Sequence, residues 1–394
     1  MFAAFARSTA LPYSNNRRDM RLDLVRGLAL ICIYIDHAPG NALSVLTLHA
    51  YGLCDASEVF VLVAGISAAI AYSPVFRRDA NDCLRRVVHR IKTLYFAHIA
   101  LAIASISILG LASHWTGNPA YHLRPTLQLL PTDALTAVAG IVTLGSQPGY
   151  LNVLPVYILL LGWLPFLLAM AKRNLLLPLA PSVLLWIAAQ YGINLPAYGE
   201  PTGWYFNPLA WQFLFTIGFV LGVAQTRSYR TPRSQPIMLA AIGYLIFTFS
   251  LASPWTAIPA LADWRIADPL WLTHQSKQNL AVLRLLNILS LAYVVVYWLP
   301  RDAGWMRHWS LGPITCIGRN GLLAFCLATI LDELLVVARL QGARGLWYQI
   351  CVNFGGFLVL WCACAWAERS NPDLGLLMRR LSPFSNRILN TGKT

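Results

Sequence analysis

Ionisable side chains gather at both ends of the first long apolar segment of the chain. Arg21, Asp23 and Arg26 lie at its start, and Asp36 and His37 lie at its end. A charge in hydrocarbon is unfavourable by about 3 kcal/mol, so charges in such a segment indicate either a function or a specific pair. Asp23 and Arg26 are three residues apart, which predicts an ion pair between them. That pair either fixes the depth of the segment in a membrane or belongs to a site.

His37 is the strongest candidate for catalysis, because a neutral imidazole held in one tautomer can remove the proton of a hydroxyl group. We expect Glu58, which enters the next apolar segment at a similar depth, to orient the ring. Asp36 is the second carboxylate candidate, although neighbours in sequence point to different faces of a helix. The sequence leaves open whether His37 acts as a base or as a nucleophile.

A cationic run, 85–92, begins the third apolar segment. Arg86 and Arg90 are four residues apart on one helix face, and arginine binds phosphate oxygens in bidentate fashion. This predicts a site for a soluble donor that carries phosphate, although a cluster that only sets membrane orientation has the same pattern. Three further arginines are candidates for this site: Arg21, Arg26 and Arg319.

Polar and aromatic residues gather near the opposite ends of the apolar segments. We expect them to recognise a polar acceptor or an anionic group, and the set comprises Trp204, Asn207, Trp211, Gln212, Lys277 and Arg284. Aromatic residues at a membrane interface are usually anchors, which is the alternative for the two tryptophans. Arg284 would lie in hydrocarbon if it faced lipid, so we expect it to face the protein interior.

The elements that must position these residues are apolar helices. The chain of 394 residues is 57% hydrophobic and only 12% charged, with a mean hydropathy of +0.56, whereas a soluble domain carries about 25% charged residues. We therefore predict an all-α polytopic transmembrane bundle with about ten spans. Its helices are expected at 22–38, 56–73, 91–111, 150–171, 175–192, 207–225, 236–252, 280–299, 313–338 and 346–366. The apolar stretch 133–145 is too short to span and is predicted to be re-entrant or peripheral.

The net charge of +14 is distributed as in a membrane protein. Of the 30 Lys and Arg residues, 22 fall in six segments that alternate with the apolar runs, which predicts that both termini are cytoplasmic. Anionic lipids are then the expected partner of these charges, and nucleic acid is not. We divide the chain into a cytoplasmic segment, 1–20, a membrane domain, 21–368, and a basic cytoplasmic tail, 369–394.

The eight cysteines lie mostly in apolar runs and form no Cys-x-x-Cys pair. We interpret them as small buried hydrophobic residues, with no disulfide framework and no metal site. The first 20 residues lack a cleavable apolar core, so no signal peptide is expected.

Several of these motifs resemble those of membrane O-acyltransferases of acyltransferase family three. Arg26-Gly27, followed by His37 after ten intervening residues, resembles the signature of that family's first helix. Further similar motifs are Arg21-Leu22-Asp23, the stretch from Phe60 to Gly65, and the pair Arg86 and Arg90. The closer likeness, over roughly residues 18–370, is to the branch of osmoregulated periplasmic glucan succinyltransferases. It rests on the stretches 35–41, 55–60, 147–157, 207–212 and 277–284.

The resemblance implies an enzyme of the bacterial inner membrane that transfers an acyl group from cytoplasmic acyl-CoA to a hydroxyl of a periplasmic glucan. Its donor would be succinyl-CoA, it would hold no permanently bound cofactor, and a homodimer is one open arrangement. Lys277 and Arg284 would meet the succinyl carboxylate, and Asn41 would contact the acceptor. The chain departs from the family pattern at three places: 152–157 lacks a Glu, 325–328 lacks a His, and Asn287 stands where the glucan branch has a His.

Two alternatives stay open at this point. One is an O-acetyltransferase that acts on another polysaccharide or on a lipid-linked sugar. The other is a proton-coupled transporter or flippase, whose intramembrane His and carboxylates would relay protons. Transporters often show repeated halves with broken helices at matched positions, and no internal repeat is visible in this sequence.

Overall fold

A computed structural model describes residues 19–123, 134–147, 149–198, 202–229, 232–252, 277–300 and 303–370. Within these ranges the regular elements are helices, which confirms the predicted all-α class. The α-helices are α1 (Met20–His37), α2 (Ala56–Arg78), α3 (Ala80–Thr116), α5 (Ala134–Val142), α6 (Val153–Arg173), α7 (Leu179–Gln190), α8 (Pro208–Thr226), α9 (Gln235–Ala252), α11 (Val282–Trp298), α12 (Gly312–Arg319), α13 (Gly321–Leu340), α14 (Gly345–Ile350) and α15 (Gly356–Ser370). A π-helical turn, Cys351–Gly355, joins α14 to α15, and short 3-10 turns include η2 (Ala42–Leu46), η3 (Leu48–Ala50) and η5 (Gly149–Asn152).

Six helical segments in the described ranges are long and apolar enough to cross a membrane. They are α2, α3, α6 with its preceding turn, α8, α13, and the continuous segment from α14 through α15. Three further apolar helices, α7, α9 and α11, are shorter, with 12, 18 and 17 residues. Helix α1 carries the charged residues discussed above. The chain is therefore a helical membrane protein, while a total of about ten spans and the cytoplasmic placement of both termini stay predictions.

Several boundaries differ from those predicted. α3 begins at Ala80 and has 37 residues, which corresponds to about 55 Å, because the cationic run 85–92 continues the helix. The helix predicted at 313–338 is interrupted at Asn320, where Gly318 and Gly321 flank a residue outside the helical region. Glycine and asparagine are poor helix formers, so an interruption at this place is physically reasonable. The short stretch 133–145 forms α5, a nine-residue helix.

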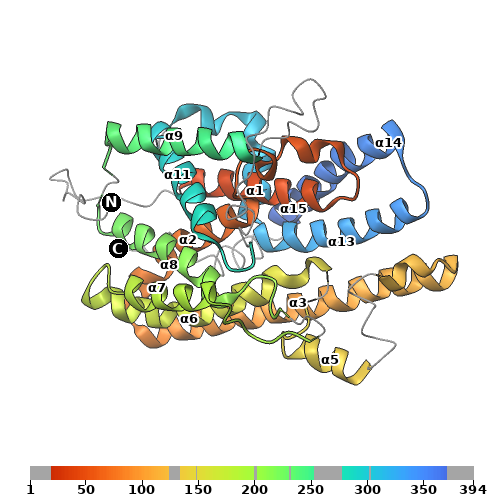
Figure 1. Cartoon of the computed structure of the whole chain (residues 1–394), viewed down its shortest axis with the longest axis horizontal. Coiled ribbons are helices and arrows are strands. Elements are labelled where there is room, and N and C mark those ends of the chain that lie inside the picture. The colour runs from red at the N-terminus through yellow and green to blue at the C-terminus, as the bar shows by residue number, and fades with distance from the viewer. Residues whose placement is uncertain are drawn as a thin grey trace, which may run out of the picture.

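Helix α1 lies in the middle of the bundle and packs against α2, α12 and α13 (Figure 1). Its contact with α12 is close, because a Cβ added at Gly318 would lie 1.8 Å from the Asp23 carbonyl oxygen. The contact between α2 and α8 is equally close, since a Cβ at Gly65 would lie 2.2 Å from the Phe215 carbonyl oxygen. Helices without Cβ atoms at their crossing can bring their backbones together, and these two crossings fix α1 and α2, which carry the candidate site.

We predict that Gly65→Ala destabilises the protein by about 1–3 kcal/mol, because the added methyl group must push α2 away from α8. The thermal unfolding midpoint of the purified protein in detergent measures the effect. Gly162→Ala, in α6, is the matched control, because nothing lies within 4 Å of the added Cβ and alanine favours the helix. A midpoint for Gly65→Ala equal to or above that of the control would contradict the close crossing.

Candidate active site

His37 is the last residue of α1, directly before Ala38 and Pro39, which end the helix. Its ring stacks on Tyr150 of η5, with ring centroids 4.1 Å apart and an angle of 19° between the planes. The Tyr150 hydroxyl donates a hydrogen bond to the His37 carbonyl oxygen at 3.1 Å. The Tyr150 ring thus covers one face of the imidazole, and the Tyr150 hydroxyl anchors the backbone of His37.

The carboxylate that faces His37 belongs to Asp332 of α13. The distance from His37 Nδ1 to Asp332 Oδ2 is 3.9 Å, and the Asp332 side chain is 1% exposed. Asp332 Oδ1 has no hydrogen-bond partner among the described residues. A carboxylate next to Nδ1 favours the tautomer that leaves Nε2 as the acceptor, and apo geometries of this kind often tighten when substrate binds.

The expected pairing of His37 with Glu58 or Asp36 is wrong in the structure. His37, Glu58 and Asp36 all lie in the described ranges, and no hydrogen bond or ion pair joins the ring to either carboxylate. Glu58 is engaged by Arg284, and Asp36 is engaged by Thr47 and His49. Asp332 was visible in the sequence as a carboxylate inside an apolar segment, but the rotation of α13 relative to α1 cannot be derived from spacing.

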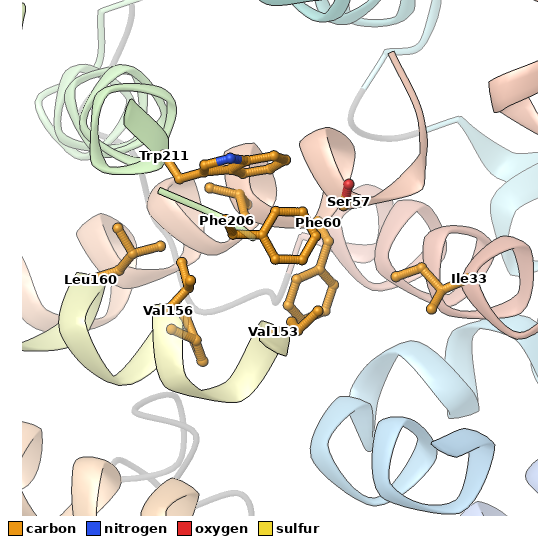
Figure 2. A pocket seen from close by; sticks show the side chains of 10 residues that line it. Ile33, Ser57, Phe60, Val153, Val156, Leu160, Phe206 and Trp211 are labelled. Carbon is orange, nitrogen blue, oxygen red and sulfur yellow. The ribbon is translucent and has the colours of Figure 1, made fainter. Parts of the chain in front are cut away.

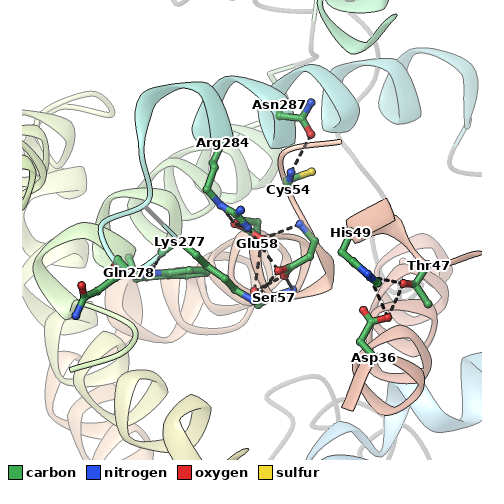
Figure 3. A network of polar contacts seen from close by, with 12 residues as sticks. Asp36, Thr47, His49, Cys54, Ser57, Glu58, Lys277, Gln278, Arg284 and Asn287 are labelled. Carbon is green, nitrogen blue, oxygen red and sulfur yellow. Dashed lines mark hydrogen bonds and ion pairs between the residues drawn. The ribbon is translucent and has the colours of Figure 1, made fainter. Parts of the chain in front are cut away.

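Glu58 is fully buried at the start of α2 and belongs to a cluster of four charged residues. Arg284 of α11 donates to Glu58 Oε1 from Nε at 2.8 Å and from a terminal nitrogen at 2.5 Å. Lys277 Nζ lies 2.5 Å from Asp55 Oδ2. Asp55 and Glu58 also form a capping box, in which the Asp55 side chain accepts from Ser57 N and Glu58 accepts from Asp55 N. Figure 3 shows Arg284 reaching Glu58, with Lys277 nearby in the same cluster.

Two cations and two carboxylates in this cluster balance each other. Burial by itself would raise the pKa of the Asp55 carboxyl, but the charge of Lys277 and several hydrogen bonds bring that pKa well below its ordinary range. Burial likewise disfavours the charged form of Lys277, yet Asp55 and Glu58 raise the pKa of its ammonium group above the usual value. Asp55 and Lys277 therefore each stabilise the charged form of the other.

This pairing corrects the expectation for Arg284, which is not a free cation that awaits a carboxylate. Its side chain is 14% exposed and is already bound to Glu58 and Asp55. Lys277 is the more accessible of the two cations, with 29% of its side chain exposed, and its Nζ lies 5.5 Å from the centre of the Phe206 ring.

The residues expected to bind the acceptor around 204–212 instead hold the fold together. Trp204, Asn207, Trp211 and Gln212 are all buried. Their polar atoms bond within the protein: Trp204 Nε1 donates to Pro196 O, Asn207 Nδ2 to Ile193 O, Trp211 Nε1 to Gln278 O, and Gln212 Nε2 to Ser182 O. Asn41 is likewise buried and forms a reciprocal amide pair with Asn353 of the π-helical turn. Recognition of an acceptor by these polar atoms would first have to break internal hydrogen bonds.

The candidate phosphate-binding arginines lie on three helices: Arg21 and Arg26 at the start of α1, Arg86 and Arg90 near the start of α3, and Arg319 at the end of α12. The predicted ion pair of Asp23 with Arg26 is present at 3.4 Å, and Arg26 also donates to Ser67 Oγ at 2.6 Å. Three of the other arginines are already paired: Arg21 with Asp19, Arg86 with Asp82 and Arg319 with Glu368. Within the described residues, no hydrogen bond or ion pair engages Arg90. Arg90 is half-buried near the start of α3.

An apolar pocket lies between α1, α2, α6 and the start of α8 (Figure 2). Ile33 lines it and precedes His37 by four residues, so both share one face of α1. The other walls come from α2, α6 and the start of α8, with Phe60, Val153, Phe206 and Trp211 pointing into the space. The pocket therefore offers apolar surface about one helical turn from the imidazole.

These features define a helical membrane protein with a histidine–carboxylate pair at the end of a central helix. The chain belongs to the OpgC protein family, whose match covers residues 18–371. This membership confirms the predicted branch and implies an acyltransferase. Comparison with curated proteins and with solved structures finds no match.

We predict that Arg284→Ala lowers the free energy of unfolding by about 3–5 kcal/mol, because it leaves the Glu58 carboxylate buried without its cation. Thermal unfolding in detergent measures the change, and Arg284→Ala combined with Glu58→Gln is expected to recover part of the loss. Arg319→Ala is the matched control, since Arg319 and Glu368 are 32% and 28% exposed and removal of a partly exposed pair has an effect of about 1 kcal/mol or less. A stable Arg284→Ala protein with altered donor selectivity would instead support the expectation that Arg284 binds the carboxylate of the acyl group.

Proposed function

We propose that this protein is a multi-pass enzyme of the bacterial inner membrane that transfers an acyl group from cytoplasmic acyl-CoA to a hydroxyl of a periplasmic glucan. The observation that carries the proposal is the arrangement of His37, stacked on Tyr150 and 3.9 Å from the buried Asp332 carboxylate, in a chain of the OpgC protein family. The alternation of cationic segments along the sequence supports an orientation with the His37 end of α1 toward the periplasm.

In this proposal His37 acts as a general base. Its Nε2 takes the proton of the acceptor hydroxyl while the oxygen attacks the thioester carbonyl carbon. The C–S bond then breaks, and the imidazolium returns the proton to the CoA thiolate, so that the products are an ester and free CoA. Asp332, rather than Glu58, stabilises the imidazolium between these steps, because its carboxylate is the one that faces Nδ1.

The donor is proposed to enter from the end of the bundle that carries the arginines. Arg90 is the main candidate for a CoA phosphate, since its guanidinium is unbound among the described residues and arginine prefers phosphate oxygens. Arg86, Arg26, Arg21 and Arg319 would have to exchange an existing partner to contribute. Arg26 and His37 are eleven residues apart on α1, or about 16 Å, which the extended arm of CoA can bridge.

We propose succinyl as the acyl group, with Lys277 as the cation that meets its free carboxylate. Two methylene groups of the acyl chain would lie against Phe206 and the neighbouring pocket wall, and Lys277 stands next to that ring. Arg284 supports Lys277 only indirectly, because both share Asp55.

We predict that His37→Ala lowers kcat by about 100-fold or more, because the acceptor hydroxyl loses its base. The measurement uses the full chain in liposomes, with radiolabelled succinyl-CoA on one side and periplasmic glucan on the other. His308→Ala is the matched control, since His308 interacts with Ser310 at an exposed position far along the sequence from the site. Transfer that survives His37→Ala would remove the assignment, and uptake of glucan into vesicles without acylation would favour a transporter.

We predict that Asp332→Asn lowers kcat about tenfold or more while the KM for acyl-CoA stays within twofold, because the imidazolium loses its counter-charge but the donor contacts are unchanged. Asp332→Glu is expected to recover part of the rate. Glu333→Gln is the comparison variant, because Glu333 is also buried and adjacent on α13. Equal losses of kcat in Asp332→Asn and Glu333→Gln would contradict a specific role of Asp332 at His37. They would show instead that α13 needs its buried carboxylates in general.

A further inference from the structure

A second histidine–carboxylate pair joins Asp36, in the last turn of α1, to His49 of η3, in the segment that leads from α1 to α2. His49 Nδ1 is 3.1 Å from Asp36 Oδ1, and Thr47 Oγ1 contacts the same carboxylate oxygen and lies 2.7 Å from His49 Nδ1 (Figure 3). The Asp36 side chain is 18% exposed, whereas the His49 side chain is 47% exposed. The carboxylate thus holds one ring nitrogen of an imidazole whose remaining surface is largely open.

An exposed aromatic pair lies beside this group. Tyr51 follows His49 by two residues and stacks on Phe249 of α9, with centroids 6.1 Å apart and planes only 4° from parallel. Each of the two residues is 37% exposed. Within the described residues, His49 and the partly exposed Asp36 therefore present a polar edge next to an aromatic face, and the buried Thr47 hydroxyl bonds to Asp36 from the protein side.

These two surfaces match the two sides of a sugar ring. Sugar hydroxyls bind to carboxylate, hydroxyl and imidazole groups, and hydrogen bonds that involve charged groups are the stronger ones. The C–H face of a sugar ring carries partial positive charge and fits the negative face of an aromatic ring. The tryptophans and amides at 204–212 offer no such surface, because they are buried and bonded internally.

The position of this surface also fits the reaction. Asp36 is the residue before His37, so the polar edge and the candidate base leave the same turn of α1 on different faces. The connecting segment that carries His49 and Tyr51 leads from His37 to Asp55, which binds Lys277 and Arg284.

We propose that Asp36 and His49, which the Thr47 hydroxyl holds together, form with the Tyr51–Phe249 aromatic pair the acceptor subsite that binds a glucose ring of the glucan and presents its hydroxyl to His37. This subsite rests on the function proposed above. In it His49 binds the sugar, and His37 removes the proton. The subsite binds the pyranose ring through hydroxyl hydrogen bonds on one edge and through stacking on one face.

The test is a steady-state comparison of His49→Gln and Tyr51→Ala with the unmodified full chain in liposomes, using succinyl-CoA and a glucan mixture extracted from bacterial periplasm. Each variant is expected to raise the KM for glucan about tenfold, which corresponds to one strong polar contact. The KM for succinyl-CoA and kcat are expected to stay within twofold, which also shows that the variants are folded. Tyr51→Phe retains the stacking ring and is expected to have a lower glucan KM than Tyr51→Ala.

Tyr205→Ala is the matched control for position, because Tyr205 is a half-exposed aromatic residue of the segment 202–207. A rise in glucan KM for Tyr205→Ala but not for Tyr51→Ala would overturn the proposal, as would unchanged glucan KM in both 47–51 variants. A kcat for His49→Gln as low as that of His37→Ala would also overturn it, because His49 would then act in the chemical step.

Binding without turnover separates this inference from the proposed function. Calorimetric titration of glucan into His37→Ala is expected to show binding, and the double variant His37→Ala, His49→Gln is expected to bind about tenfold more weakly. Equal affinity of the two proteins would overturn the subsite. If the unmodified protein binds glucan through the 47–51 segment but transfers no acyl group to it, the subsite stands and the acyltransfer proposal fails.

Discussion

The structure depends on one constraint: a carboxylate buried in an apolar bundle must find a cation or a hydrogen-bond donor. Glu58, fully buried at the start of α2, meets this requirement through Arg284 of α11 and the backbone N–H of Asp55. An unpaired charge at that depth would destabilise the fold by several kcal/mol, on the order of the whole stability of many proteins. The pair therefore ties α2 to α11 and closes the bundle around the end of α1, where His37 lies.

Asp332 meets the same constraint less completely, and this difference is informative. Its carboxylate is 1% exposed, yet it lies 3.9 Å from His37 Nδ1, and Oδ1 has no partner among the described residues. A group that served only the fold would be expected to be bonded fully, as Glu58 is. A carboxylate that must stabilise a charge appearing on the imidazole during reaction gains from a loose contact at rest, because the interaction is then stronger in the transition state than in the ground state.

Much of the helical class could be predicted from the sequence, because apolar runs of about 20 residues have few other stable structures. The Asp23–Arg26 pair could also be predicted, since both residues lie on one helix and the spacing decides the contact. Pairings between helices could not. Glu58 and Asp36 were expected beside His37 because they are near in sequence, whereas Asp332, almost 300 residues away, takes that position. The rotation of each helix depends on close contacts such as Gly318 against Asp23, which no periodicity reveals.

The same limit explains why the aromatic residues at 204–212 looked like a binding surface. Composition shows that tryptophan and asparagine gather there, but it cannot show that Trp211 and Asn207 direct their polar atoms toward 277–279 and 193. Those bonds hold Lys277 beside Asp55, and Lys277 in turn faces the Phe206 ring. The residues at 204–212 thus position Lys277. The exposed polar groups lie instead in the segment after α1. In the proposed reaction, one turn of α1 would serve both donor transfer and acceptor binding, because His37 faces Asp332 and Asp36 faces His49.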